Sequence, residues 1–158
     1  MNEPALNHLR SDGSAHMVDV SAKQVSVRSA TAAGRVLLSA AAVDALRAGT
    51  VPKGDALSVA RIAGIQAAKR TPELIPLAHP IDVHAVEVDL VVVDDGVDLS
   101  ATVRTADRTG VEMEALTAVA VAALALIDMV KAVDRAARIT DVHVTAKSGG
   151  RSGDWVQS

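Results

Sequence analysis

Charged side chains stand at both ends of an unusually apolar stretch, Gly110 to Val133. Glu112 and Glu114 lie near its start, and Asp128 and Lys131 interrupt its apolar end. A charge in such surroundings is costly unless it is paired or used. For Asp128 and Lys131, which lie in an apolar helix, the setting favours a functional role.

The residues between these charges predict a buried helix. Ala115 to Ile127 contains no charged residue, no glycine and no proline, and is rich in alanine and leucine. Its apolar side chains surround the helix rather than forming a stripe, which is typical of a helix buried on most sides. The uncharged segment is shorter than the roughly 20 residues of a membrane span, so we expect no membrane partner.

Helix geometry separates the charged residues into two ends. Asp128 and Lys131 lie about 60° apart on neighbouring turns and can pair, whereas Glu112 and Glu114 lie about 160° apart. Glu114 and Asp128 share a face but stand about 21 Å apart along the axis. If both serve one site, either the ligand is long or the site is shared between subunits.

A structural explanation competes with the functional one. Glutamates near a helix N-terminus complement the helix dipole, and an Asp–Lys pair three residues apart is common on surfaces. Residue types alone favour this explanation for the two glutamates.

Composition excludes several classes of protein and site. The 158 residues carry a net charge of −3, no cysteine, and Trp155 as the single aromatic residue of the Phe, Trp and Tyr type. Without a basic field or stacking platforms, nucleic acid is not expected as a partner. The absence of cysteine excludes thiolate metal sites and fits a reducing compartment, the cytoplasm. A core of small aliphatic side chains favours an oligomer.

The sequence predicts a polar, flexible arm over residues 1–15 and a single domain over residues 16–158. Alternation and capping signals predict strands at 24–32, 83–93, 97–103 and 139–147, and helices at 39–47, 55–70 and 110–133. Asp94-Asp95-Gly96 predicts a hairpin, and 74–80, with two prolines, a constrained loop. Counting the first two helices as one crossover gives βαββαβ. This is the α+β, ferredoxin-like plan, a four-stranded antiparallel sheet with helices on one face.

Other candidate groups are weaker when taken singly. Lys53 lies between a proline and a glycine, and Lys147 and Arg151 bracket a Ser-Gly-Gly turn that could cradle phosphate. A surface charge is the commoner meaning of each such residue. His79, in the constrained loop, suits ligand contact or proton transfer, although a structural hydrogen bond is the commoner role. No dense ligand spacing predicts a metal.

Seven blocks of the sequence together resemble one family. They are HMVDVSAK (16–23), KGD (53–55), ARIAGIQAAKRT (60–71), LIPLAHP (74–80), TGVEMEALTAV (109–119), DMVKAV (128–133) and AKSGGRSGD (146–154). They resemble the cyclic pyranopterin monophosphate synthase family, also called molybdenum cofactor biosynthesis protein C or MoaC. The resemblance covers nearly the whole chain.

The resemblance implies a lyase of molybdenum cofactor biosynthesis. Such an enzyme converts 3′,8-cyclo-7,8-dihydro-GTP to cyclic pyranopterin monophosphate, releases pyrophosphate and needs no metal or organic cofactor. It also implies a ferredoxin-like subunit in a homohexamer, a trimer of dimers, with active sites at subunit interfaces. A shared site would place Glu114 and Asp128 of different subunits around one ligand.

The resemblance also implies roles for individual residues. Asp128 would be the general acid or base, with Lys131 as its partner, and Lys53 and Lys147 would serve proton transfer and the triphosphate. The substrate pocket would be lined by Leu77, Ala78, His79, Glu112, Met113 and Glu114.

Three positions depart from the family pattern. Ala78 and Val130 stand where the family often has cysteine, and Arg151 where lysine is common. None of these changes removes a proposed catalytic group. The alternative to an enzyme is a non-enzymatic oligomeric module that binds a small anionic nucleotide effector. Asp128 separates the two hypotheses, because a binder of polyphosphate has no use for a carboxylate beside its lysines.

Overall fold

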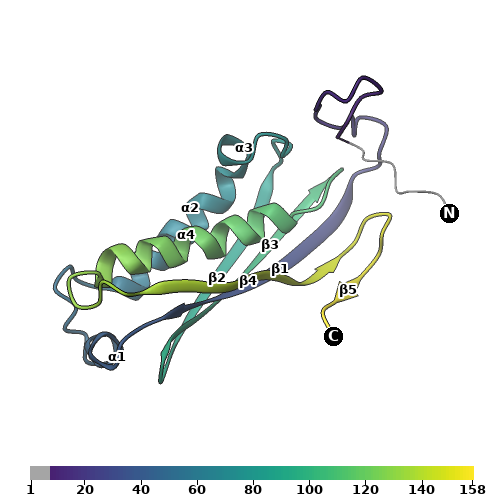
Figure 1. Cartoon of the computed structure of the whole chain (residues 1–158). Helices are drawn as coiled ribbons and strands as arrows, with labels where there is room; N and C mark the ends of the chain where they lie inside the picture. The colour runs from purple at the N-terminus through teal and green to yellow at the C-terminus, as the bar shows by residue number, and fades with distance from the viewer. Residues whose placement is uncertain (1–7) are drawn as a thin grey trace.

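The protein, described here from a computed structural model, is an antiparallel sheet with two helices laid across one face (Figure 1). The structure describes residues 8–158, so part of the predicted arm, 1–15, lies outside the described residues. The elements are β1 (Ser26–Leu37), α1 (Ala40–Ala48), α2 (Ala56–Lys69), α3 (Thr71–Leu74), β2 (Val83–Val93), β3 (Gly96–Asp107), α4 (Glu112–Val130), β4 (Arg138–Ser148) and β5 (Trp155–Val156).

The sheet has the order β2-β3-β1-β4-β5, and every neighbouring pair is antiparallel. The predicted α+β class and antiparallel sheet are therefore confirmed, but the expected count of four strands is wrong. The fifth strand forms because Gly149 and Gly150 take left-handed backbone conformations and turn the chain back. Trp155 then pairs with Lys147. A strand of two residues has no periodicity for a sequence pattern to reveal.

The core lies between one face of this sheet and the helices α2 and α4. Ala30, Ala32 and Val36 of β1 are buried there, because alternate residues of a strand point to the same face. α4 is long and apolar enough to cross a membrane by length and composition alone. Here its apolar surface packs in the core against α2 and the strands, so α4 is a core helix.

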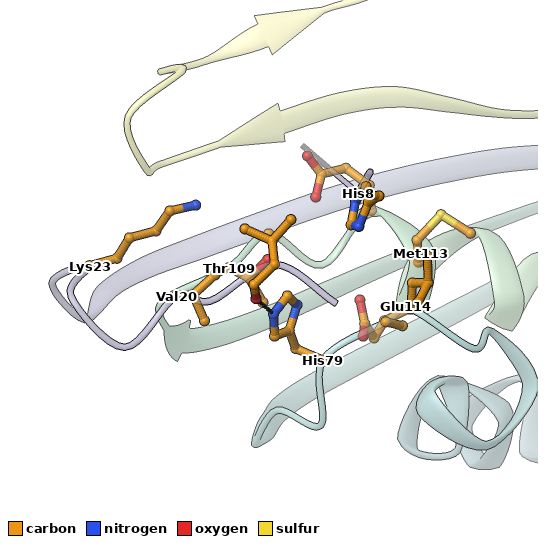
Figure 2. A pocket seen from close by; sticks show the side chains of 12 residues that line it. His8, Val20, Lys23, His79, Thr109, Met113 and Glu114 are labelled. Carbon is orange, nitrogen blue, oxygen red and sulfur yellow. Dashed lines mark hydrogen bonds between the residues drawn. The ribbon is translucent and has the colours of Figure 1, made fainter. Parts of the chain in front are cut away.

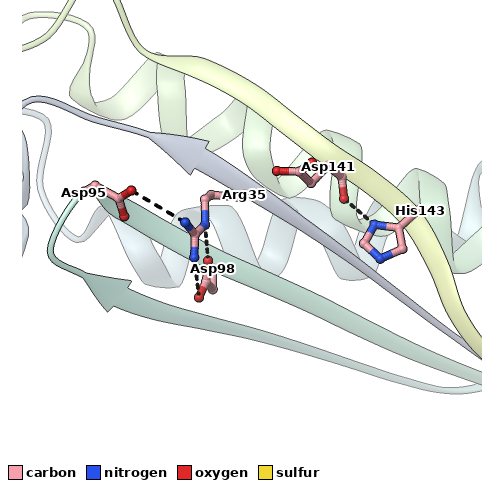
Figure 3. A network of polar contacts seen from close by, with 5 residues as sticks. All are labelled: Arg35, Asp95, Asp98, Asp141 and His143. Atoms are coloured by element: carbon pink, nitrogen blue, oxygen red, sulfur yellow. Dashed lines mark hydrogen bonds and ion pairs between the residues drawn. The ribbon is translucent and has the colours of Figure 1, made fainter. Parts of the chain in front are cut away.

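The opposite face of the sheet carries polar pairs between neighbouring strands. Arg35 of β1 lies directly across from Asp98 of β3, and its Nε donates to the carboxylate at 2.6 Å (Figure 3). Thr31 and Thr102 join the same two strands through their hydroxyl groups at 2.8 Å. These cross-strand pairs fix which residues of β1 face away from the core.

Several predicted boundaries are confirmed and others move. Ser39 caps α1 by accepting the Ala42 N–H, and Asp55 caps α2 by accepting the Ser58 N–H at 3.0 Å. The first strand runs to Leu37 rather than 32, because the small residues after 32 weaken its alternation without ending it. α3 was not predicted; its proline lies in the first turn, where no N–H is needed.

The hairpin between β2 and β3 forms where it was predicted, but its two turn residues are Asp94 and Asp95. Gly96 belongs to β3, where it pairs with Val93. A side chain at Gly96 would collide with the Val36 carbonyl, so glycine is required there by the close approach of β1.

Close packing of α2 on α4 predicts the sign of a substitution at Gly64. A Cβ at this position would lie 2.9 Å from the Ala118 carbonyl oxygen and 3.1 Å from the Ala122 Cβ. In an ordinary helix Gly→Ala stabilises by roughly 0.5–1 kcal/mol. We expect Gly64→Ala to destabilise instead, by about 1–3 kcal/mol, because the helices must separate. Thermal and chemical denaturation, with exposed Gln66→Ala as a control, measure this effect; a stabilised Gly64→Ala would contradict the packing.

Candidate active site

The C-terminal end of α4 carries a cluster of one carboxylate and two lysines. Lys131 Nζ lies 2.7 Å and Lys53 Nζ 3.1 Å from the same oxygen of Asp128. Lys53 comes from the turn before α2, where the Gly54 N–H donates to the Val51 carbonyl. The predicted pairing of Asp128 with Lys131 is confirmed, and the structure adds Lys53 to it.

The two lysines decide the charge of Asp128. Hydrogen bonds from Lys131 and Lys53, together with their positive charges, hold the pKa of the Asp128 carboxyl below its usual value. The group is therefore an anion at neutral pH and can accept a proton. All three side chains are between 40% and 57% exposed, and exposed ion pairs contribute little to stability. Their convergence therefore adds little to the stability of the fold.

A second polar group lies at the N-terminal end of α4. Lys147 of β4 places its Nζ 3.1 Å from Glu112 Oε1 and donates to Ser152 Oγ at 3.0 Å. Ser152 belongs to the turn between β4 and β5, whose Gly149 N–H donates to the Asp154 carboxylate. The glycine-rich tail thus forms a defined turn beside Lys147.

A cavity of about 270 Å³ opens beside this end of α4 (Figure 2). All six residues predicted to bind substrate line it: Leu77, Ala78, His79, Glu112, Met113 and Glu114. Leu77, Ala78 and His79 come from the segment between α3 and β2, and the other three from the first turn of α4. The wall mixes apolar side chains with a few polar groups, as small-molecule sites do.

His79 has a defined proton arrangement at this cavity. Its Nε2 lies 2.5 Å from the Val18 carbonyl oxygen, which can only accept a hydrogen bond. Nε2 therefore carries the proton, and Nδ1 of the neutral ring is left as an acceptor. The segment containing Val18 and Val20 is held against the cavity by this bond.

Glu114 is the buried carboxyl group of the cavity. Glu114 is only 3% exposed. This burial, with a contribution from the charge of Glu112, raises the pKa of the Glu114 carboxyl to about 7. At neutral pH the group is present in both protonated and ionised forms. A glutamate that merely complements the helix dipole would be exposed and ionised, so the structural explanation does not account for Glu114.

Two cations near the cavity were missed by sequence reasoning. Lys23 lines the cavity itself and, with Arg28 and Arg151, an adjoining cavity of about 430 Å³. Arg28 and Lys147 line a third, polar cavity of about 220 Å³. The three cavities share lining residues and form a continuous surface. Lys23 belongs to HMVDVSAK, the first sequence block that resembles the family, and that block could have identified it. Arg28 lies on β1, and no motif around it indicates a function.

The two ends of α4 remain apart within one chain. Glu114 and Asp128 are fourteen residues apart on one continuous helix, about 21 Å along its axis. Asp128, Lys131 and Lys53 therefore do not meet the cavity residues of the same chain. Within residues 8–158, no three or more His, Asp or Glu side chains converge as metal ligands would.

The raised pKa of Glu114 predicts how stability depends on pH. The folded protein keeps this carboxyl protonated up to about pH 7, whereas the unfolded chain ionises it near 4.5. Its contribution is therefore fully present below pH 4.5 and is lost as pH rises through about 7. Glu114→Gln, a neutral amide of similar size, should remove this decline in melting temperature. Exposed Glu73→Gln serves as the control, and parallel declines for the parent and Glu114→Gln would contradict the assignment.

Comparison with known proteins identifies the family of this chain. The sequence model of the MoaC family matches residues 17–150. The cyclic pyranopterin monophosphate synthase of Streptomyces coelicolor is 63% identical over 153 residues, 97% of this chain and 90% of that protein. Proteins of the same name from a Nocardioides species and from Corynebacterium efficiens are 62% and 57% identical, each over 95% of this chain and 94% and 97% of their own. The chain belongs to the MoaC family.

Proposed function

We propose that this protein is a cyclic pyranopterin monophosphate synthase of molybdenum cofactor biosynthesis. Its substrate would be 3′,8-cyclo-7,8-dihydro-GTP, and pyrophosphate the second product. Family membership and the names of relatives over 60% identical support the activity. The single structural observation that carries the mechanism is the contact of Asp128 with two lysines at once.

The cavity and its neighbours suit the two parts of this substrate. The base-derived ring would enter the cavity, between the thioether of Met113 and the carboxyl of Glu114. The triphosphate would extend along the adjoining cavities towards Lys147, Arg28 and Lys23. Guanidinium and ammonium groups are the usual partners of phosphate.

The last step places clear demands on these residues. A sugar hydroxyl attacks the α-phosphorus, the bond from this phosphorus to the bridging oxygen breaks, and pyrophosphate leaves with the bonding electrons. The hydroxyl proton needs a base, and ionised Asp128 can accept it. The negative charge that builds on the leaving group needs cations nearby, and lysines supply them.

Asp128 and the cavity can serve one substrate only if two chains build the site. We therefore propose the homohexamer, a trimer of dimers, in which Asp128, Lys131 and Lys53 of one subunit face the cavity of another. The separation of about 21 Å along α4 supports this arrangement. So do large apolar side chains left exposed on the helices, such as Leu124 of α4 and Ile62 of α2, which an interface would bury.

Two finer assignments belong to the same proposal. The order β2-β3-β1-β4 within a βαββαβ sequence supports a ferredoxin-like subunit with β5 added at one edge. A cytoplasmic location is supported by the absence of cysteine and by relatives that are bacterial biosynthetic enzymes.

Turnover of 3′,8-cyclo-7,8-dihydro-GTP tests the function, with the product oxidised to a fluorescent pterin and pyrophosphate assayed separately. We expect product from the parent and a kcat lowered about 10²- to 10⁴-fold in Asp128→Asn, because a positioned acid or base contributes that much. The kcat of Lys131→Ala should fall similarly. Lys131→Arg should keep the ion pair with Asp128 without restoring proton transfer.

Exposed Asp44→Asn and Lys69→Ala are the matched controls and should keep the parent rate. Tight binding of the substrate by the parent without any product would overturn the enzyme assignment. The protein would then be a module that binds an anionic nucleotide.

A further inference from the structure

A small hairpin, residues 8–16, precedes the region that matches the family model, which begins at residue 17. The Arg10 N–H donates to the Ser14 carbonyl at 2.8 Å, and the His16 N–H donates to the His8 carbonyl at 2.9 Å. The Asp12 carboxylate accepts both the N–H and the hydroxyl of Ser14 across the turn. Backbone pairing and this side-chain contact therefore hold the segment together as a hairpin.

The hairpin places the His8 side chain at the cavity. His8 is one of the residues lining it, together with Met113 and Glu114 from α4. Figure 2 shows the His8 ring directed towards the space bounded by Met113, Glu114 and His79. His8 is an exposed residue that also lines the cavity, so it forms part of the rim rather than the floor.

The proton arrangement of His8 follows from a hydrogen bond of its ring. Its Nδ1 lies 3.3 Å from the His16 carbonyl oxygen, which can only accept. Nδ1 therefore carries the proton, and Nε2 of the neutral ring is an acceptor. His79 has the opposite arrangement, with Nε2 as the donor to Val18. The cavity thus offers an imidazole acceptor from each of two segments.

We propose that His8 is a substrate-binding residue, whose Nε2 accepts a hydrogen bond from an N–H group of the base-derived ring. This inference rests on the proposed function, because it assigns the occupant of the cavity to that substrate. A ring derived from guanine carries N–H donors along its edge. His8 Nε2, an acceptor on the rim of the cavity that Glu114 also lines, gives such an edge a hydrogen-bond partner. Recognition of the phosphates does not involve this acceptor.

The contact should affect recognition of the ring and leave recognition of phosphate unchanged. GTP and inorganic pyrophosphate are the probes, since both carry phosphates and only GTP has the guanine ring. His8→Ala should weaken GTP binding about tenfold, the usual effect of losing one hydrogen bond to a buried partner. It should leave pyrophosphate binding unchanged. His8→Gln, whose amide oxygen can replace Nε2 as an acceptor, should restore part of the affinity.

His143→Ala is the matched control, because the His143 Nδ1 also contacts a backbone carbonyl, that of Asp141, on a distant part of β4. It should bind both probes like the parent. Nitrogen chemical shifts provide a readout that a structural role would not move: the His8 Nε2 signal should shift on adding GTP and stay in place on adding pyrophosphate.

Turnover of 3′,8-cyclo-7,8-dihydro-GTP by the same proteins separates failure of this inference from failure of the function. An active parent, with His8→Ala unchanged in KM and in GTP affinity, would overturn the His8 contact and leave the function standing. An inactive parent that binds GTP through His8 would overturn the function and leave the contact standing. Weaker GTP binding and a raised KM, with kcat little changed, is the result we expect.

Discussion

Burial of α4 between the sheet and α2 determines where the charged groups at its two ends lie. Ala115, Ala118 and Ala122 are fully buried along it, and Gly64 of α2 approaches so closely that no Cβ fits. Small side chains on both helices permit this approach, and interiors packed to this density do not deform easily. α4 therefore acts as a rigid spacer that holds the charged groups at its two ends about 21 Å apart.

The same helix places two carboxyl groups in opposite environments. Asp128 is half exposed and held by two ammonium groups, which keep its pKa low, whereas burial raises the pKa of Glu114 to about 7. One group is a resting anion suited to accept a proton, and the other can hold a proton at neutral pH. Carboxyl groups whose pKa values are pushed apart by their surroundings are typical of acid–base enzymes.

Sequence patterns predicted the parts of this architecture that local physics determines. Alternating valines gave β2, the caps Ser39 and Asp55 gave the starts of α1 and α2, and helical spacing gave the pairing of Asp128 with Lys131. Each depends on residues close together in the chain.

Features that depend on distant segments could not be predicted in the same way. Burial of Glu114 is created by the segments packed around it, so its position in the sequence suggested only a dipole partner. The Lys53–Asp128 contact joins residues 75 positions apart, and Lys23 and Arg28 reach the cavities only once β1 is in place. The family resemblance assigned Lys53 and the cavity residues, but no spacing rule would have brought them together.

We propose that one site is built from opposite ends of α4 in two subunits, and subunit complementation tests this arrangement. Asp128→Asn and Lys147→Ala subunits with different affinity tags are co-expressed, and assemblies carrying both tags are purified. Each variant alone should be nearly inactive. We expect recovery of about a quarter of the parent activity on random mixing, because some sites then combine an intact Asp128 with an intact Lys147. Doubly tagged assemblies as inactive as either variant alone would contradict it.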